Sequence, residues 1–261
     1  MRKALTIAVL AGASFAWGQA PSDADAAALI EKGREKALAY AESLPDFVAT
    51  EVIRRYTGVP GTNFSHRTPT DSLTIQLRYF QHREEHKLIQ YNGEPTNAVF
   101  EKLEGLRGSG EFGITISAIF KPESQTGFHF EKWITVRRRP AARLAYEVDA
   151  AHTRYVLQSK IYGQEVAAAV SYHGILEIDA ETGEVLHLEY VADHIPKELR
   201  VLHAASAVDY ALADIGGREY LLPSHSEMEL HGHESWEKNV IEFRDYRKFS
   251  ADSSIEFGPV K

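Results

Sequence analysis

The search for catalytic residues begins with the string His82-Arg83-Glu84-Glu85-His86, which has the inverted pattern of the zinc proteases. In that chemistry two imidazoles bind one metal while the glutamate transfers a proton, so both histidines must lie on one face of a helix. The residues on either side are typical of β-strands, and in an extended chain residues four positions apart are separated by about 13 Å. We therefore interpret the string as a polar hairpin turn.

Three histidines near the end of the chain, His225, His231 and His233, form a second candidate metal site. Side chains two positions apart on a strand point to the same side, so His231 and His233 have a spacing that some metal sites on strands use. The chain has 12 histidines, and such pairs arise by chance at that number. We expect a solvated or ligand-lining strand end and no metal, with a metal-dependent hydrolase as the weaker alternative.

The remaining features that could support catalysis have simpler interpretations. The chain has no Cys and no Gly-x-Ser-x-Gly motif. The loop Gly108-Ser109-Gly110 can offer backbone amides to an anion, but it lacks a P-loop lysine, and close packing of two elements is the simpler interpretation. The carboxylate pairs Glu84 with Glu85 and Asp179 with Glu181 fall in predicted turns. We expect neither catalysis nor a cofactor.

The first residues indicate export. Arg2 and Lys3 precede an apolar run from Ala4 to Trp17, which small residues follow, and this is the order of a secretory signal peptide. The run is too short to span a membrane comfortably, so we predict a signal peptide over residues 1–18 rather than an integral membrane protein. Without Cys the chain can form neither a disulfide nor a bacterial lipid anchor, which favours a bacterial periplasm over a eukaryotic secreted domain, so we predict a periplasmic or extracellular location.

The charge of the chain excludes one class of partner. The formal net charge is −8, and it becomes about −10 once Arg2 and Lys3 are removed with the signal peptide. Nucleic acid needs a basic face, so we expect none as a partner. The basic run Arg137-Arg138-Arg139 precedes Pro140 and is interpreted as a solvated hairpin tip, with phosphate or anionic lipid binding as the alternative.

Two helices are predicted among short strands. From Ser22 to Leu44 apolar residues recur at three-to-four spacing, and Pro45 ends this helix. A second, short helix is predicted over 111–120, after the glycines at 108 and 110. Between Pro45 and Ser72 the chain forms one strand, 47–57, and a loop over 58–71 that holds two Pro and two Gly.

Strands fill most of the remaining chain. They are predicted over 73–80, 87–91, 127–138, 141–149, 153–162, 165–172, 174–179, 184–192, 206–213, 218–222, 224–231 and 236–249. No helical run is long enough for a crossover between parallel strands. The sequence predicts a mainly β (α+β) fold, in which residues 19–261 form one domain with a curved antiparallel sheet as an unclosed barrel around one or two helices.

Aromatic residues recur in almost every predicted strand, and most of them must belong to the core. A sheet that closes only partly over a helix can leave a concave apolar face, which suits an acyl chain. We expect the ligand-binding side chains of this face to include Phe112, Ile116, Phe120, Tyr79 and Trp133.

A family resemblance rests on strings in the last third of the chain. They are Tyr172-His173-Gly174-Ile175-Leu176-Glu177-Ile178-Asp179-Ala180-Glu181-Thr182-Gly183-Glu184-Val185-Leu186, Tyr220-Leu221-Leu222-Pro223 and Ile241-Glu242-Phe243-Arg244-Asp245-Tyr246-Arg247. With the N-terminal helix and the long antiparallel sheet, this order resembles the periplasmic lipoprotein carriers of the LolA and LolB type and the RseB-like stress regulators. The resemblance covers residues 172–249 well and the earlier chain in outline.

The resemblance implies a half-barrel with a ligand on its concave face. In the carriers an Arg facing the helix-lined cavity controls acyl binding, and Arg54, Arg55 and Arg78 are candidates for it here, with Arg78 added to the predicted binding site. We therefore predict an exported, non-enzymatic protein that binds an apolar small molecule or lipid, or a lipidated chain. The alternative is a periplasmic protein-interaction or envelope-stress sensing module that holds a protein partner.

Overall fold

The computed structural model describes residues 23–59, 68–108, 110–233 and 235–249. The predicted signal peptide and Ser22 lie outside these described residues, as does most of the predicted 58–71 loop. The helices are α1 Asp23–Ser43 and α2 Ile114–Phe120, with short 3₁₀ helices η2 Phe100–Lys102, η3 Pro122–Ser124 and η4 Lys197–Leu199. The strands are β1 Phe47–Gly58, β2 Thr68–Phe80, β3 Arg83–Tyr91, β4 Glu94–Pro95, β5 Gly127–Val136, β6 Arg139–Val148, β7 Val156–Ile161, β8 Gln164–Ala169, β9 Ser171–Asp179, β10 Val185–Asp193, β11 Val201–Asp214, β12 Glu219–Gly232 and β13 Trp236–Lys248.

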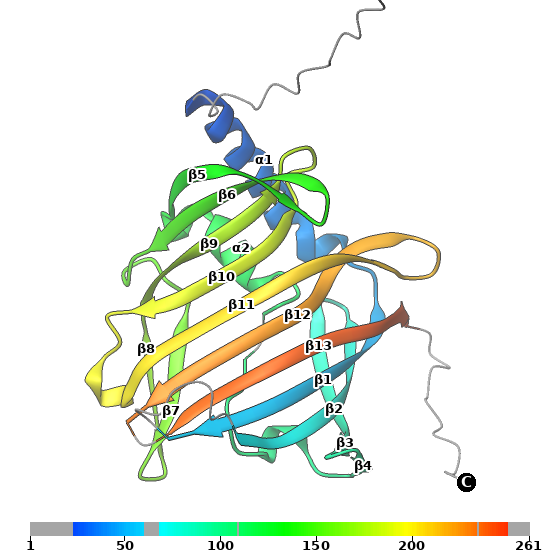
Figure 1. Ribbon diagram of the computed structural model, residues 1–261, viewed down its shortest axis with the longest axis vertical. Helices are drawn as coiled ribbons and strands as arrows, with labels where there is room; N and C mark the ends of the chain where they lie inside the picture. Colours follow the sequence, from blue (N-terminus) through cyan, green and yellow to red (C-terminus); the bar gives the residue numbers. More distant parts are fainter. Residues whose placement is uncertain (1–22, 60–67, 109, 234, 250–261) are drawn as a thin grey trace, which may run out of the picture.

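One large sheet dominates the described part of the chain. Its 11 strands run in the order β4-β3-β2-β1-β13-β12-β11-β10-β9-β6-β5, and β7 and β8 form a separate two-stranded hairpin. Every pair in the large sheet is antiparallel. The sheet curves, its end strands β4 and β5 do not pair, and α1 and α2 lie on its concave side (Figure 1). The predicted fold class, an unclosed antiparallel half-barrel around helices, is confirmed.

Alternating hydrophobic residues direct one face of each strand toward the helices. On β2 the side chains of Leu73, Ile75, Leu77 and Tyr79 are buried, while those between them are partly exposed. This period of two is the pattern of a strand with one solvated face. The side with the buried residues is the inner face of the sheet, and the other is the convex face.

The core consists of three hydrophobic clusters. The first joins α1 and α2 to β6, β9 and β10, and Phe120 in it is fully buried. The second fills the space between β1, β2 and β13, with Phe47 and Phe112 among its members. The third is smaller and lies under the β7–β8 hairpin, where Leu157 and Val170 pack against Leu199 and neighbouring residues. No single cluster spans the whole inner face in the described residues.

Both predicted helices form, close to the predicted bounds. The first ends at Ser43 because Pro45 follows it and cannot donate a backbone hydrogen bond. The second begins after Gly113, whose φ of 105° lies in the left-handed region that glycine adopts without strain. Gly113 therefore gives the chain a sharp turn into α2.

Several predicted strand limits were wrong. The turn between β2 and β3 consists of Gln81 and His82 alone, both with positive φ. Arg83 to His86, which were predicted to be part of a polar turn, belong to β3. The predicted break at Pro223 does not occur, because a register shift beside Pro223 lets β12 continue past a residue without a backbone N–H. The predicted 58–71 loop is shorter, since β1 includes Gly58 and β2 begins at Thr68.

The basic run before Pro140 is only partly a solvated tip. Arg137 and Arg138 form the two-residue turn between β5 and β6. Arg137 donates to the carbonyl of Tyr210, and Arg139 pairs with Asp179 at 2.7 Å. Arg137 and Arg138 are both exposed, but the contacts of Arg137 and Arg139 mean that two of the three guanidinium groups stabilise the fold and do not form a free anion site.

Candidate ligand-binding hollow

One row of inner-face side chains crosses five neighbouring strands. Register pairs Tyr190 of β10 with Ser206 of β11, Ser206 with Met228 of β12, Met228 with Asn239 of β13, and Asn239 with Arg55 of β1. Residues directly opposite each other in antiparallel strands project to the same side. The row is therefore aromatic and apolar at the β10 end and polar at the β1 end.

A segment of the chain covers the polar end of this row. We call residues 100–108, between β4 and α2, the crossing segment. Arg55 Nη1 donates to the carbonyl of Glu104 at 2.6 Å, and Asn239 Nδ2 donates to the carbonyl of Leu106 at 2.8 Å. Glu237 Oε2 accepts a hydrogen bond from the Leu106 amide at 2.8 Å. These contacts fix the crossing segment over β13 and β1.

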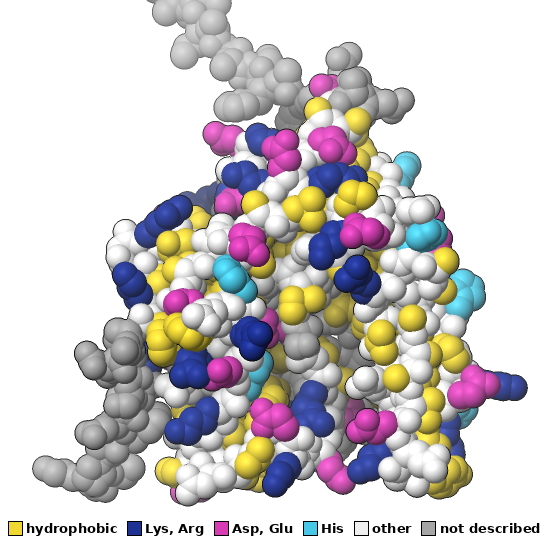
Figure 2. All heavy atoms as spheres, turned by 180° about the vertical axis from the view of Figure 1, so that it is seen from behind, with side chains coloured by type: hydrophobic (Ala, Val, Ile, Leu, Met, Phe, Trp, Pro, Cys, Tyr) yellow, Lys and Arg dark blue, Asp and Glu magenta, His cyan; other side chains and the backbone are white. Residues whose placement is uncertain are grey.

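The apolar end of the row stays half-covered. Tyr155, Tyr190, Met228 and Leu230 are all half-buried and lie at the borders of the three hydrophobic clusters. Met228 borders the crossing segment, where its side chain lies against Gly108, and Tyr155 and Leu230 pack against the cluster under the β7–β8 hairpin. Figure 2 shows the concave side, which is hollowed in its middle, with hydrophobic side chains in its depth and charged side chains around it. We call this region of the inner face the hollow.

Tyrosine rings form one wall of the hollow. Tyr155 contacts Tyr190 and Tyr172 edge to face, with ring centroids 5.2 and 5.6 Å apart, and Tyr172 contacts Tyr146 in the same way at 6.0 Å. Gly174 lies beneath this group, where a Cβ would be 1.9 Å from the backbone oxygen of Glu189. A side chain at 174 would clash with the backbone of β10, so glycine is required for the rings to pack there.

Three carboxyl groups that are buried or half-buried lie on the inner side of the half-barrel. We call Glu51 of β1, Glu84 of β3 and Glu111, just before α2, the carboxyl cluster. Burial raises the pKa of Glu51 to about 8, with smaller contributions from the charges of Glu111 and Glu84. Burial, followed by the charge of Glu111, raises the pKa of Glu84 to about 7, and burial also raises the pKa of Glu111. Near neutral pH the cluster therefore retains protons that ordinary glutamates have lost.

No basic side chain of the described residues forms an ion pair with the carboxyl cluster. His86 Nε2 is 3.6 Å from Glu51 Oε2, but burial lowers the pKa of His86, so this imidazole is neutral at pH 7. Glu51 Oε2 is buried and makes no hydrogen bond. The cluster is thus an uncompensated group of acids on the inner face.

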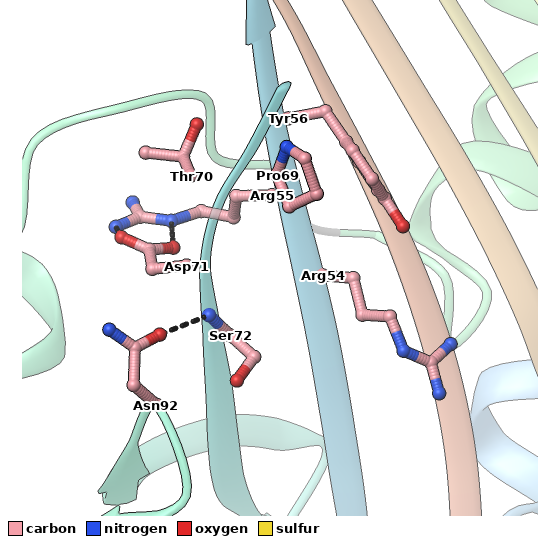
Figure 3. A pocket seen from close by; sticks show the side chains of 8 residues that line it. All are labelled: Arg54, Arg55, Tyr56, Pro69, Thr70, Asp71, Ser72 and Asn92. Atoms are coloured by element: carbon pink, nitrogen blue, oxygen red, sulfur yellow. Dashed lines mark hydrogen bonds and ion pairs between the residues drawn. The ribbon is translucent and has the colours of Figure 1, made fainter. Parts of the chain in front are cut away.

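A small cavity of about 290 Å³ lies near the ends of β1 and β2. Figure 3 shows Arg55 and Asp71 facing each other there, while Arg54 points away on the other side of β1. Arg55 Nε and Nη2 each lie 2.5 Å from an Asp71 oxygen, and Tyr91 donates to the same carboxylate at 2.9 Å. Both arginines are paired with acids, Arg54 with Glu242 at 2.7 Å. Among the described residues that line the cavity, no cation is therefore left free for an anionic ligand.

The predicted binding residues separate into two groups. Phe112, Ile116, Phe120 and Tyr79 are at most 3% exposed and belong to the hydrophobic clusters. Trp133 is 42% exposed on the edge strand β5 and contacts Phe130. That any of them contacts a ligand stays a prediction.

The three candidate arginines differ in the face they occupy. Arg78 lies on the convex face of β2, opposite in direction to Tyr79, where it pairs with Glu85 and covers Phe249. Arg54 also lies on the convex face. Arg55 alone among the three lies on the inner face, where it binds the crossing segment.

The candidate metal-binding histidines do not come together. His225 and His231 lie on the convex face of β12, about 20 Å apart by strand rise, and His233 lies beyond the strand end. His231 stacks against His203, with ring centroids 4.9 Å apart. Within the described residues no three His, Cys, Asp or Glu side chains are placed to hold a metal ion.

Another histidine on the convex face, His187, has a raised pKa and is protonated at neutral pH. His187 Nδ1 lies 2.9 Å from Asp209 Oδ1, and its Nε2 lies 3.6 Å from Glu189. Burial lowers the pKa of His187, but the bonds to Asp209 and Glu189 outweigh it and raise the pKa to about 9. This imidazolium links β10 to β11.

The sequence did not identify the row that forms the floor of the hollow. Ser206, Met228 and Asn239 have no chemical signature, and their alignment depends on the register of strands that the sequence cannot reveal. The alternation of hydrophobic and polar residues along each strand places them on the buried side, and this pattern is the one signal in the sequence that could have identified them.

The fold is similar to several solved structures. One is a LolA superfamily protein of Nitrosomonas europaea, with 12% identity over 86% of this chain and 94% of that chain, and a TM-score of 0.34. Another is a putative outer membrane lipoprotein-sorting protein domain of Vibrio parahaemolyticus, with 12% identity over 87% and 95% of the two chains and a TM-score of 0.37. A third is a chain of the MucA/MucB complex of Pseudomonas aeruginosa, with 10% identity over 81% and 92% and a TM-score of 0.22.

No protein-family model and no curated protein matches the chain. Among the described residues no helix has the length and apolar character needed to cross a bilayer. A LolA superfamily protein and a chain of the MucA/MucB complex, which correspond to the predicted resemblance, are thus among the structures to which the chain is similar. The described part of the chain is an open antiparallel half-barrel with a partly covered inner face.

Proposed function

We propose that this protein binds an apolar chain, from a lipid or a lipidated partner, in the hollow between the crossing segment and the β7–β8 hairpin. The observation that carries the proposal is that Tyr190 and Met228, on either side of the buried Ser206 in the row, are only half-buried and leave apolar surface that the core does not cover. Pockets for apolar ligands are concave, mostly apolar and supplied with few polar groups. The role is binding without catalysis.

The direction of the row supports an amphiphilic ligand. Its apolar end lies beside the tyrosines, and its polar end is occupied by Arg55 and Asn239 under the crossing segment. An acyl chain on the apolar end would bury area worth about 0.8 kcal/mol per methylene group. The ligand would then approach the crossing segment with its polar part.

We also propose that the protein is exported and acts in the periplasm, after removal of residues 1–18. This proposal rests on the order of Arg2, Lys3 and the apolar run that follows. Expression of the full chain in a bacterial host, followed by mass measurement of the periplasmic protein, tests it. A chain that begins at residue 19 is expected, and an uncleaved chain in the cytoplasm would contradict it.

Native mass spectrometry of the periplasmic protein, followed by organic extraction and lipid analysis, tests binding. We expect an acyl species that survives gel filtration. The variant Met228→Trp should fill the apolar floor and lose that species, whereas Leu212→Trp, at a residue 52% exposed on β11, should retain it. A protein without ligand, or equal retention in both variants, would reject this site and favour the protein-interaction alternative.

A further inference from the structure

The apolar floor of the hollow ends where the crossing segment meets it. A Cβ at Gly108 would lie 2.1 Å from Met228 Cε and 2.8 Å from Met228 Sδ, so the end of this side chain fills the space beside the crossing segment. Next to Met228 in the row, Asn239 is 4% exposed and donates to the carbonyl of Leu106 at 2.8 Å. Met228 and Gly108 therefore close the hollow on this side, and we call their contact the first stop.

Tyr155 closes the opposite end of the floor. Its ring contacts those of Tyr190 and Tyr172 edge to face, and Tyr172 behind it is only 4% exposed. The backbone of Tyr155 is fixed, because its carbonyl accepts a hydrogen bond from the Val170 amide at 3.0 Å. Its own amide donates to Thr153 Oγ1 at 2.9 Å. We call the Tyr155 ring the second stop.

The floor between the two stops is short. Tyr190, which the Tyr155 ring contacts, is on β10, and Met228 is on β12, with β11 between these strands. Two strand spacings amount to about 10 Å, which is about the length of eight methylene groups in an extended chain. One half of the hydrocarbon core of a bilayer is about 15 Å thick. The floor is therefore shorter than the chains that fill a typical membrane leaflet.

We propose that the two stops fix the length of the apolar chain that the hollow accepts, so that the protein selects chains of medium length. Met228 and Tyr155 are then the residues that determine specificity. This inference rests on the proposed function and specifies the ligand of the same site. Each methylene group that fits between the stops should increase the affinity about fourfold, while further groups meet a stop and add nothing.

The backbone that carries each stop does not depend on the side chain at the stop. Met228 lies in β12, which is paired on both sides, with β11 and with β13. Tyr155 is held through its backbone groups. The φ of Gly108 lies outside the left-handed region, so alanine fits the backbone there and only its Cβ meets Met228. Substitutions at these three positions should therefore change the length of the hollow and leave the large sheet unchanged.

Binding of saturated monoacylglycerols of about 6 to 18 carbons tests the inference. Their head group is small and uncharged, and their affinity is measured by displacement of the fluorescent probe N-phenyl-1-naphthylamine from the purified protein. In the wild type the affinity should rise about fourfold per carbon and then level off. We call the chain length at which it levels off the limit.

Substitutions at the stops should move the limit in opposite directions. Met228→Ala removes three heavy atoms and should raise the limit by about three carbons, and Tyr155→Ala removes a ring and should raise it by about four. Because the stops lie at opposite ends of the floor, the two increases should add in the double variant. Gly108→Ala pushes the end of Met228 into the hollow and should lower the limit. Val191→Ala, on the convex face of β10, serves as the control and should keep the wild-type limit.

Circular dichroism establishes that each variant folds. If Met228→Ala does not fold, Met228→Val replaces it and should give a smaller shift in the same direction. Affinity that rises through the whole series in the wild type, or a limit that is equal in the wild type and the folded stop variants, would overturn this inference and leave apolar binding intact. A wild type that binds no monoacylglycerol of any length would reject the proposed function and this inference with it.

Discussion

Replacing Glu51 with Gln should stabilise the protein, and increasingly so as pH rises. Glu51 is 6% exposed, its Oε2 makes no hydrogen bond, and its pKa is raised from 4.5 to about 8. The folded state therefore holds a proton that the unfolded chain releases above its ordinary pKa. Stability from this group is complete below about pH 4.5 and falls as pH rises toward 8.

The magnitude follows from the size of the pKa change. A shift of one unit corresponds to about 1.4 kcal/mol, so the wild type loses roughly 3 kcal/mol by pH 7 and up to about 5 kcal/mol by pH 8. The amide of Gln does not ionise, so Glu51→Gln avoids this loss while keeping the shape of the side chain. The variant still has a buried polar group at position 51, which adds a difference in free energy of unfolding between the two proteins that does not change with pH.

Urea unfolding of both proteins at pH 5, 6, 7 and 8 measures the effect. The difference in free energy of unfolding should shift in favour of Glu51→Gln at each step, by about 1.4 kcal/mol per pH unit at the steepest part. Glu104→Gln, at an exposed site, serves as the control and should show no trend. A difference that is constant with pH would refute the assignment of a buried, protonated Glu51.

Three other substitutions test separate parts of the fold. His187→Gln should lower the free energy of unfolding by up to about 3 kcal/mol at pH 6, because the pKa of His187 is raised to about 9. The stability that charged His187 contributes is complete below pH 6.5 and is lost as pH rises through 9. In urea unfolding above pH 10 the variant and the wild type should therefore be equally stable. Phe120→Ala removes a fully buried ring and should cost about 3–5 kcal/mol in the same assay, with a drop below 1 kcal/mol contradicting its burial. Asp71→Asn leaves Arg55 without its carboxylate and should cost about 3–5 kcal/mol, an effect that Asp245→Asn on an exposed residue should lack.

The architecture was largely predictable because its local patterns agree with it. Pro45 ends the first helix, alternation defines β2, and Asn92-Gly93 forms the two-residue turn that such a pair favours. The predicted strand ends at Pro223 and near Gln81 were wrong for the same reason, because backbone pairing with a neighbouring strand overrides local propensity.

The site was less predictable than the fold. Phe112 and Phe120 belong to the inner side, as the pattern indicates, but how tightly they pack depends on partners distant in sequence such as Phe47 and Phe128. The row from Tyr190 to Arg55 joins five strands whose registers no local pattern encodes. The burial of Glu51 could not be predicted either, because a single acidic residue on a strand with alternating hydrophobic residues is normally expected to be exposed to solvent.

The β7–β8 hairpin interrupts the chain without interrupting the sheet. Strands β6 and β9 on either side of it pair with each other continuously, up to the couple Val148 and Tyr172. Residues 149–170 are therefore a topological insertion, which a short connection could replace while every ladder of the large sheet is kept. Shortening it would uncover Leu199 and Val201 and remove one side of the hollow. The length of this insertion can thus vary, and with it the size of the hollow, without a change in the register of the large sheet.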